Sequence, residues 1–290
     1  MVFFSPTPMP DLHHALEETV TRDVTRALAE DIGTGDLTAR LVPPERQARA
    51  RVMTRENGVL CGAEWFNRTF EELDPDVEIF WHRKDGDDIV AGSSLCELEG
   101  NARAMLTAER TGLNFLQLLS GVATRTRMFV RAVAGTRAKI LDTRKTIPGL
   151  RLAQKYAVRT GSGTNNRIGL YDGILIKENH LASAGGVRAA LAAALHAAGS
   201  ATMVQVEVES LEQLREALAA GAKLILLDNF DLERMREAVR VTADRAELEA
   251  SGGVTLETVR AIAETGVHRI SIGSLTKDVE ALDLSMRFVH

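Results

Sequence analysis

The residues best suited to chemistry follow short apolar segments in the second half of the chain. In chain order these segments are 139–141, 173–176, 203–208, 224–227, 246–250 and 269–272. The polar residues at or just after their ends are Arg144, Lys145, Lys177, Glu207 and Asp228, followed by the turns Ser251-Gly252-Gly253 and Gly273-Ser274. If the segments are parallel strands, their carboxyl ends open on one face, where α/β barrels build their active sites. We therefore expect these residues to converge on one mouth.

Four of the basic residues would form a cationic pocket in a chain of net charge −5: Arg144, Lys145, Arg167 and Lys177. Several fixed cations suit a ligand with more than one carboxylate or phosphate, because the arginine fork grips planar oxyanions through two hydrogen bonds. The alternative for any one of them is a solvated position in a surface loop.

The acidic residues of this set, Glu207 and Asp228, are hydrogen-bond acceptors when ionised. They suit the hydroxyl groups of a ribose or a hard cation such as Mg²⁺. Lys177 could instead be a structural ion-pair partner of either carboxylate. Glu209 is interpreted as a surface or helix-entry residue, and His180 as a loop histidine with its hydrogen bonds satisfied.

Two glycine-containing turns, Ser251-Gly252-Gly253 and Gly273-Ser274, expose backbone N–H groups just before a helix. Such turns after the last strands of a barrel commonly bind phosphate. A single Gly-Gly turn can also be a simple helix entry. Residue types and spacing alone thus support an anion-binding α/β enzyme and go no further.

The composition is that of a globular protein with an interior of aliphatic residues. Of the 290 residues, 45% are hydrophobic, 26% are charged and only 4% are aromatic. The negative net charge argues against nucleic acid or an anionic membrane as a partner. Cys61 and Cys96 are expected to be reduced thiols. The first residues lack a basic region and a long apolar core, so we expect no signal peptide and a cytoplasmic protein.

The elements that must position these residues change character along the chain. Residues 11–30 have helical spacing, and residues 47–106 contain short strand-like segments with one helix near 64–73, which indicates an α+β unit. A long helix is expected over 107–134. Beyond it, six short strands alternate with helices, which favours parallel strands joined by crossovers. The fold class is therefore α/β.

Several longer segments resemble the quinolinate phosphoribosyltransferase family. They are residues 142–151 (DTRKTIPGLR), 154–163 (QKYAVRTGSG), 165–167, 175–180 and 207–209, together with 30–38, 108–114 and 119–124 upstream. The resemblance runs in order through nearly the whole chain, and the DTRKT stretch is its most specific part.

The resemblance implies an N-terminal α/β sandwich domain followed by an open six-stranded α/β barrel. The sandwich would span residues 1–114, joined by the C-terminal segment 280–290, and the barrel would span 115–279. Family members are homodimers or assemblies of dimers in which each active site faces the partner's N-terminal domain. Arg110 matches an arginine that reaches the site across that interface.

The resemblance also implies a reaction: transfer of a phosphoribosyl group from phosphoribosyl pyrophosphate to quinolinate, with decarboxylation, in NAD biosynthesis. Its products are nicotinate mononucleotide, pyrophosphate and carbon dioxide, and its metal is Mg²⁺. The residues that would hold the quinolinate carboxylates are Arg144, Arg167 and Lys177. Those near the ribose, the metal and the pyrophosphate are Glu207, Asp228 and Lys145, and those near the 5′-phosphate are Ser251, Gly253, Gly273 and Ser274. The catalytic set is then Lys145, Lys177, Glu207 and Asp228.

One position departs from the family pattern. Where many relatives have Asn-His-Arg, this chain has Asn165-Asn166-Arg167. Asparagine can donate a hydrogen bond but cannot carry charge or move a proton, so Asn166 is a candidate for binding only. Three other functions remain open: a phosphoribosyltransferase for nicotinate or another heterocycle, a Schiff-base lyase using Lys177, and a non-catalytic metabolite-binding relative.

Overall fold

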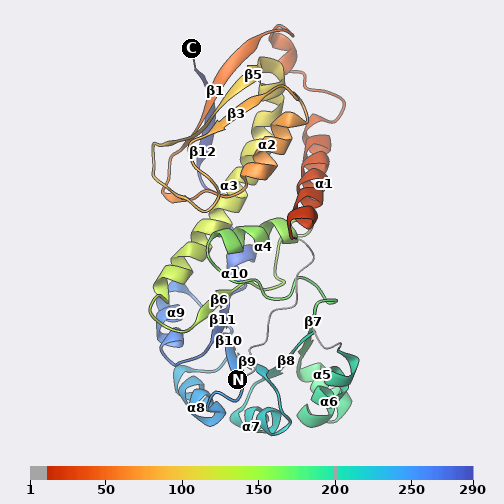
Figure 1. Ribbon diagram of the computed structural model, residues 1–290, viewed down its shortest axis with the longest axis vertical. Coiled ribbons are helices and arrows are strands. Elements are labelled where there is room, and N and C mark those ends of the chain that lie inside the picture. The colour runs from red at the N-terminus through yellow and green to blue at the C-terminus, as the bar shows by residue number, and fades with distance from the viewer. Residues whose placement is uncertain (1–11, 199–201, 290) are drawn as a thin grey trace. The chain divides into compact units, whose positions relative to one another are not determined.

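The computed structural model describes residues 12–198 and 202–289 (Figure 1). The opening segment, in which no signal peptide is expected, lies outside the described residues. Within the described ranges, none of the helices combines the length and the apolar character needed to cross a bilayer.

The chain divides into two compact units, each assembled from separate stretches of sequence. The parallel-sheet unit contains residues 128–145 and the described residues of 163–274. The antiparallel-sheet unit contains the described residues 12–127, 146–162 and 275–289.

The antiparallel-sheet unit is built on a sheet in the order β12-β1-β5-β3. Its strands are β1 (Gln47–Thr54), β3 (Glu78–Trp81), β5 (Ser94–Asn101) and β12 (Leu284–Val289). In β1, the buried Ala50 and Val52 alternate with exposed arginines, as expected for a strand with one face in the core. On the outer face, Arg51 pairs with Glu97 of β5, with 2.7 Å between Nη2 and Oε1. The alternation therefore fixes which face of this sheet is buried.

Helices cover this sheet and fill the rest of the unit. Its remaining elements are α1 (Leu12–Ile32), the 3₁₀ turn η1 (Ala39–Leu41), β2 (Gly58–Val59), α2 (Ala63–Glu71), β4 (Asp88–Ile89), α3 (Ala102–Ala132) and α4 (Arg151–Thr160). The start of α3 at Ala102 corrects the expected start at 107. The side-chain oxygen of Asn101 accepts the N–H groups of Arg103 and Ala104, at 3.0 and 3.2 Å, and so caps the helix earlier than its apolar spacing indicated.

The two units divide the chain differently from the domains expected from the sequence, 1–114 with 280–290 and 115–279, and those boundaries stay a prediction. One buried cluster explains why the structure groups residues 115–127 and 146–162 with the antiparallel sheet. This cluster combines side chains of α2, α3 and α4, namely Trp65, Phe115, Leu119, Val122, Ala153 and Ala157. The long α3 thus belongs to one core over most of its length.

The parallel-sheet unit contains six strands in the order β6-β11-β10-β9-β8-β7. They are β6 (Lys139–Leu141), β7 (Gly173–Ile176), β8 (Met203–Val208), β9 (Leu224–Asp228), β10 (Glu247–Ser251) and β11 (Arg269–Ser271). All neighbouring pairs are parallel. In the described part of the chain, no strand pairing joins β6 to β7, so the sheet is open. The expected α/β class, with an antiparallel sheet and six parallel strands, is confirmed.

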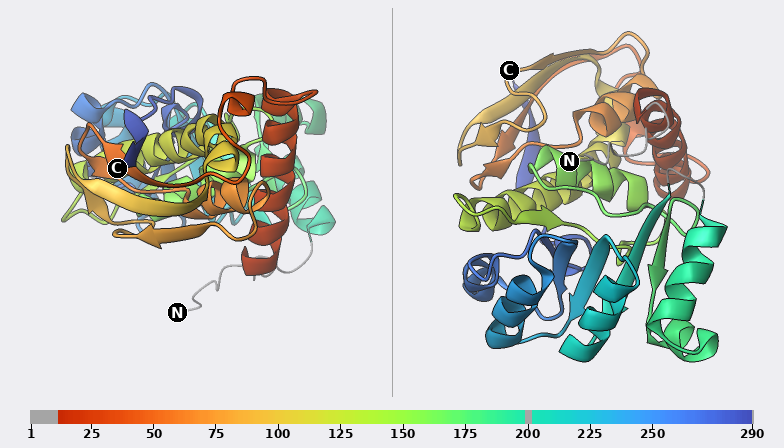
Figure 2. Two further views of the ribbon diagram at one scale, coloured as in Figure 1. Left: turned by 90° about the horizontal axis from the view of Figure 1, so that it is seen from above. Right: turned by 60° about the horizontal axis from the view of Figure 1, so that its bottom comes forward.

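Helices connect these strands and lie along the sheet (Figure 2). They are α5 (Glu178–Ala184), α6 (Val187–Ala197), α7 (Leu211–Ala219), α8 (Leu232–Thr242), α9 (Leu256–Ala263) and α10 (Ser274–Lys277), the last of which leads out of the unit. Two of them begin at residues that cap helices well. The Ser210 hydroxyl accepts the N–H of Gln213 at the start of α7, and the Asp231 carboxylate accepts that of Arg234 at the start of α8. These caps fix where the chain leaves the carboxyl edge of the sheet.

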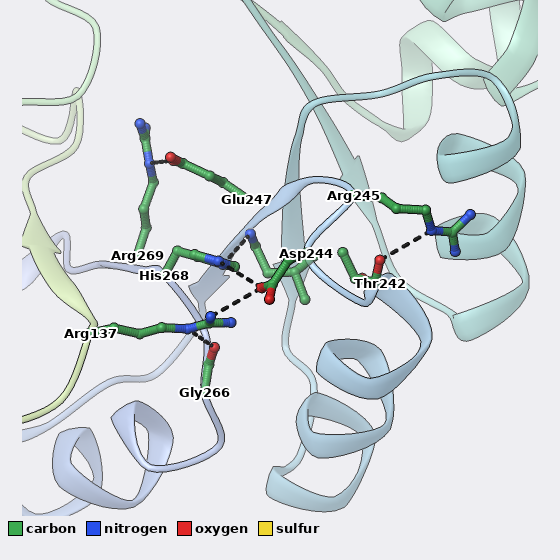
Figure 3. Close-up of polar contacts among 9 residues, drawn as sticks. Arg137, Thr242, Asp244, Arg245, Glu247, Gly266, His268 and Arg269 are labelled. Atoms are coloured by element: carbon green, nitrogen blue, oxygen red, sulfur yellow. Dashed lines mark hydrogen bonds and ion pairs between the residues drawn. The ribbon is translucent and has the colours of Figure 1, made fainter. Parts of the chain in front are cut away.

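A cluster of polar side chains links neighbouring segments of the chain at the amino ends of β10 and β11 (Figure 3). Nδ1 of His268 accepts the backbone N–H of Leu248 at 3.1 Å, and its Nε2 lies 3.6 Å from Oδ1 of Asp244. Arg137 bonds the same carboxylate at 3.1 Å and the Gly266 carbonyl at 2.8 Å. Burial, and then the charge of Arg137, lowers the pKa of His268. The fold therefore favours the neutral ring, whose Nδ1 can accept a hydrogen bond.

We expect His268→Phe to lower the free energy of unfolding at pH 8 by about 1–3 kcal/mol, because the Leu248 N–H loses its acceptor. The folded pKa of His268 lies below its unfolded value, so its contribution is complete above about pH 6.5 and is lost as the pH falls further. Thermal unfolding between pH 5 and 8 should therefore show a shallower pH slope in the variant.

The control is His196→Gln, which replaces an exposed histidine on α6. It should keep the wild-type stability at pH 8. A His268→Phe variant with the wild-type pH slope would contradict the assigned role of the ring.

Candidate active site

The carboxyl edge of the parallel sheet carries the expected site residues. Lys177 follows β7 directly, Glu207 lies one residue before the end of β8, and Asp228 and Ser251 end β9 and β10. The remaining members of the set in this unit lie after β6, β10 and β11: Arg144, Lys145, Asn166 and Arg167 are in the connection after β6, Gly253 follows β10, and Gly273 and Ser274 follow β11. Because all six strands are parallel, these positions lie on the same edge.

Arg110 is the one member of the expected set in the antiparallel-sheet unit. It lies on α3, and its side chain is exposed. Its assignment to a partner's active site stays a prediction.

Two arginines of the parallel-sheet unit act on each other electrostatically. Burial, and then the positive charge of Arg144, lowers the pKa of Arg167, while Asp172 opposes this shift. Nη1 of Arg167 donates to the Gly173 carbonyl at 2.8 Å, which orients the guanidinium group. The Asp172 carboxylate accepts the N–H of Ile168 at 2.6 Å and so closes the loop that carries Arg167. Two partly buried cations held near each other form a site that an anion would stabilise.

Lys177 and two carboxylates form the neighbouring part of the edge. Burial raises the pKa of Glu207 most, Lys177 lowers it, and Asp228 and Glu209 raise it. Within the described ranges, Lys177 forms no ion pair with Glu207 or Asp228 closer than 4.0 Å. Its ammonium group therefore acts on Glu207 at longer range and is available to a ligand.

His180 lies in α5 and not in a loop as expected, and its ring has the structural role of an acceptor. Its Nδ1 accepts the backbone N–H of Lys177 at 3.0 Å, which closes the first turn of α5. This bond supports Lys177 and occupies one nitrogen of the ring.

The turn after β10 has a backbone that requires glycine. Gly252 has φ +106°, and a Cβ at this position would overlap Oδ1 of Asn229. The Asn229 N–H donates to the Ser251 carbonyl at 3.0 Å, and its side-chain amide donates to Asp228 at 3.0 Å. The turn before α9 and the carboxylate at the end of β9 are thus held together through one asparagine.

Lys145 lies against the second glycine turn. A Cβ at Gly273 would come within 2.9 Å of Cδ of Lys145 and 3.6 Å of Oγ1 of Thr143. The lysine side chain therefore lies along the backbone of the turn after β11, and its ammonium group adds a positive charge beside that turn. Exposed backbone N–H groups and a lysine together suit a phosphate group.

A buried polar layer that the sequence did not predict lies beneath this edge. Its members are Asp142, Gln205 and Glu249, each at most 1% exposed. The signal that could have identified Glu249 is the acidic residue between Leu248 and Ala250, in a strand that is otherwise buried there.

Comparison with known proteins identifies the family of this site. The model of the quinolinate phosphoribosyl transferase N-terminal domain matches residues 36–120, and that of the C-terminal domain matches residues 122–287. The chain belongs to the quinolinate phosphoribosyltransferase family. The expectation drawn from the sequence motifs is confirmed.

Individual relatives extend over almost the whole chain. A probable nicotinate-nucleotide pyrophosphorylase [carboxylating] of Bacillus subtilis is 47% identical over 257 residues, covering 89% of each chain. The structure of the nicotinate-nucleotide pyrophosphorylase from Francisella tularensis superposes with a TM-score of 0.92 at 45% identity, covering 98% of each chain. The structure of human nicotinic acid phosphoribosyltransferase shares the fold alone, at 16% identity and a TM-score of 0.61 over 93% of this chain and 74% of that one.

We expect Gly252→Ala to disturb the turn after β10. The left-handed backbone and the overlap with Asn229 should lower the free energy of unfolding by about 1–3 kcal/mol. The affinity for phosphoribosyl pyrophosphate, measured by titration calorimetry, should fall about tenfold, because the turn that binds the 5′-phosphate shifts relative to Asp228.

Gly221→Ala is the matched control, since Gly221 has φ +86° and a Cβ there would meet no atom within 4 Å. It should show backbone strain but unchanged binding. Equal affinity for phosphoribosyl pyrophosphate in the two variants would refute the role given to the turn.

Proposed function

We propose that this chain is a carboxylating nicotinate-nucleotide pyrophosphorylase. It transfers the phosphoribosyl group of phosphoribosyl pyrophosphate to quinolinate and releases pyrophosphate and carbon dioxide, giving nicotinate mononucleotide for NAD biosynthesis. The names of the Bacillus subtilis and Francisella tularensis relatives support this activity. The observation that carries it is the pair of partly buried arginines, Arg144 and Arg167, whose charges act on each other in an acidic chain.

The cationic residues divide between the two substrates in this proposal. Quinolinate carries two adjacent carboxylates, and Arg144, Arg167 and Lys177 supply charge-assisted donors for them. Lys145, lying against Gly273, supplies a positive charge to the phosphate side. Ser251, Gly253 and the Gly273-Ser274 turn bind the 5′-phosphate through backbone N–H and hydroxyl groups.

The reaction requires positioning and charge stabilisation more than a covalent intermediate. The lone pair of the pyridine nitrogen forms a bond to the anomeric carbon as the bond from that carbon to pyrophosphate breaks. Glu207 and Asp228 hold the ribose hydroxyls while the sugar is electron-poor. The quaternised ring then draws in electrons as the bond to the adjacent carboxylate breaks, and the ring carbon takes up a proton. Holding both reactants in line can lower the barrier by about 7–11 kcal/mol.

Glu207 and Asp228 also fit the Mg²⁺ that the family resemblance implies. Both are oxygen ligands at one edge, and the charge of Asp228 acts on Glu207. In the described part of the chain there is no group of three or more acidic, histidine or cysteine residues that could hold a metal ion. Mg²⁺ commonly binds through one or two carboxylates together with substrate phosphates and water, so two suffice. When bound, the ion would neutralise charge on the departing pyrophosphate.

We also propose that the chain forms a homodimer in which Arg110 serves the partner's site. Its exposed position on α3 supports this role, because a long arginine there is free to reach a second chain. We also place the enzyme in the cytoplasm, where the buried free thiols of Cys61 and Cys96 would stay reduced.

The purified protein, incubated with Mg²⁺ and phosphoribosyl pyrophosphate, should convert quinolinate to nicotinate mononucleotide and release carbon dioxide. Its kcat/KM for quinolinate should exceed that for nicotinate at least about tenfold, since a second carboxylate adds charge-assisted hydrogen bonds of about 1.5–3 kcal/mol. Chromatography of the nucleotide product and capture of labelled carbon dioxide would measure both. A preference for nicotinate would instead identify a different phosphoribosyltransferase. Tight quinolinate binding without pyrophosphate release would identify a binding protein.

Arg144→Ala and Lys177→Ala should each raise the KM for quinolinate about 10- to 100-fold, by removing a charged donor to a carboxylate. Steady-state kinetics at saturating phosphoribosyl pyrophosphate would measure this. Lys139→Ala is the control, because Lys139 is exposed at the opposite end of β6. Wild-type KM values in both test variants would refute the assignment, and borohydride trapping of Lys177 with a keto substrate would favour the Schiff-base lyase.

A further inference from the structure

A buried carboxylate that the proposed reaction does not use lies beneath the carboxyl edge of the parallel sheet. Glu249 of β10 is fully buried. Its Oε2 accepts the side-chain amide of Gln205 at 3.0 Å, and its Oε1 accepts that of Asn166 at 3.4 Å. Each oxygen therefore has a donor from a different part of the chain.

The alternation of side chains relates this layer to the site. Gln205 and Glu207 are two residues apart on β8 and share a face, and so do Glu249 and Ser251 on β10. Strand β9 lies between β8 and β10 in the sheet (Figure 1), so the bond from Gln205 to Glu249 passes over it. The pair thus lies one step beneath Glu207 and Ser251, on the same face.

The contact with Asn166 reaches the loop after α4 that carries Arg167. The Asn166 N–H donates to Oδ1 of the buried Asp142 at 2.8 Å, and its side-chain oxygen accepts the Arg167 N–H at 2.8 Å. Asn165 donates to the other oxygen of Asp142 at 2.6 Å. Asn166 therefore connects Glu249 to the backbone at Arg167 and to the end of β6, two residues before Arg144.

Glutamate at this position has a chemical requirement that glutamine cannot meet. A carboxylate offers two acceptor oxygens, one for each amide, whereas glutamine would turn an N–H₂ group toward one of the two donors. Burial raises the pKa of Glu249, and Asp142 raises it further, while hydrogen bonds from Ser271 and Gln205 and the charge of Arg269 lower it. The donors thus offset part of the cost of a buried charge.

We propose that Glu249 is a positioning residue for the quinolinate site, which fixes the Asn166 side chain and thereby the loop that holds Arg167. This inference rests on the proposed function. It gives Asn166 a supporting role, in which its amide joins the buried Glu249 carboxylate to the backbone N–H of Arg167.

The test compares Glu249→Gln with Glu247→Gln, which changes the same residue type two positions earlier on β10. Glu247 is exposed and pairs with Arg269 at 2.8 Å at the amino end of the strands (Figure 3). Glu249→Gln should raise the KM for quinolinate about tenfold, while kcat and the KM for phosphoribosyl pyrophosphate stay within about threefold. Glu247→Gln should leave all three constants unchanged.

A double-mutant cycle separates positioning from a general loss of stability. Asn166→Ala alone should raise the quinolinate KM, and adding Glu249→Gln should raise it little further, because both changes break one chain of contacts. Additive effects would overturn the proposal, as would a Glu249→Gln variant with the wild-type KM.

If Glu249→Gln does not fold, Glu249→Asp keeps both acceptor oxygens but draws them back from Asn166. A raised quinolinate KM in that variant supports the proposal, and the wild-type value overturns it. Wild-type protein without quinolinate turnover would refute the proposed function itself.

Discussion

Burial, and then the positive charge of Arg144, lowers the pKa of Arg167, so two guanidinium groups repel each other in the connection between β6 and β7. The rest of the site depends on the two guanidinium groups being held close together despite their repulsion. Without a rigid frame, the two flexible side chains would move apart into water and the charge would be dispersed. The frame is supplied by Arg167's bond to the Gly173 carbonyl and by the loop that Asp172 closes. An anion that enters this edge therefore removes an existing repulsion in addition to forming new hydrogen bonds.

The parallel sheet makes this concentration of charge possible by separating it from the core. Along β9, Leu224 to Leu227 are buried, and the chain becomes polar only at Asp228. In β8 polar residues appear earlier, because Gln205 and Glu207 share one face of the strand. The apolar residues stabilise the strands, and each strand end presents one functional group at a fixed height. Asn229 then joins the ends of β9 and β10, so that neighbouring groups do not move independently.

The sequence predicted the strand ends well because two independent patterns agree there. Short apolar segments end in charged residues, and the same residues carry the family motifs, so the six strands of the parallel sheet and the residues at their ends were predictable. Contacts between distant segments were not. Asn101 begins α3 earlier than its apolar spacing indicates, because the cap is a single side chain. Residues 146–162 join the antiparallel-sheet unit through a buried cluster that no local pattern shows. Glu249 was missed for the same reason, since its partners lie on β8 and on the loop after α4.

The full burial of the Glu249 carboxylate is unfavourable if only the free energy of folding is considered. Well-packed apolar residues often replace buried charged groups without loss of stability, whereas removing one member of a buried polar network leaves the others unsatisfied. The arrangement around Glu249 is directional: one oxygen faces Gln205 and the other faces Asn166. An apolar side chain could fill the same space but could not dictate where the Asn166 amide points. The side-chain oxygen of Asn166 accepts the backbone N–H of Arg167, so the orientation of the amide also fixes the position of this arginine. Packing alone would not require a buried acid at this position. The need to fix the geometry of the anion site explains why Glu249 is there.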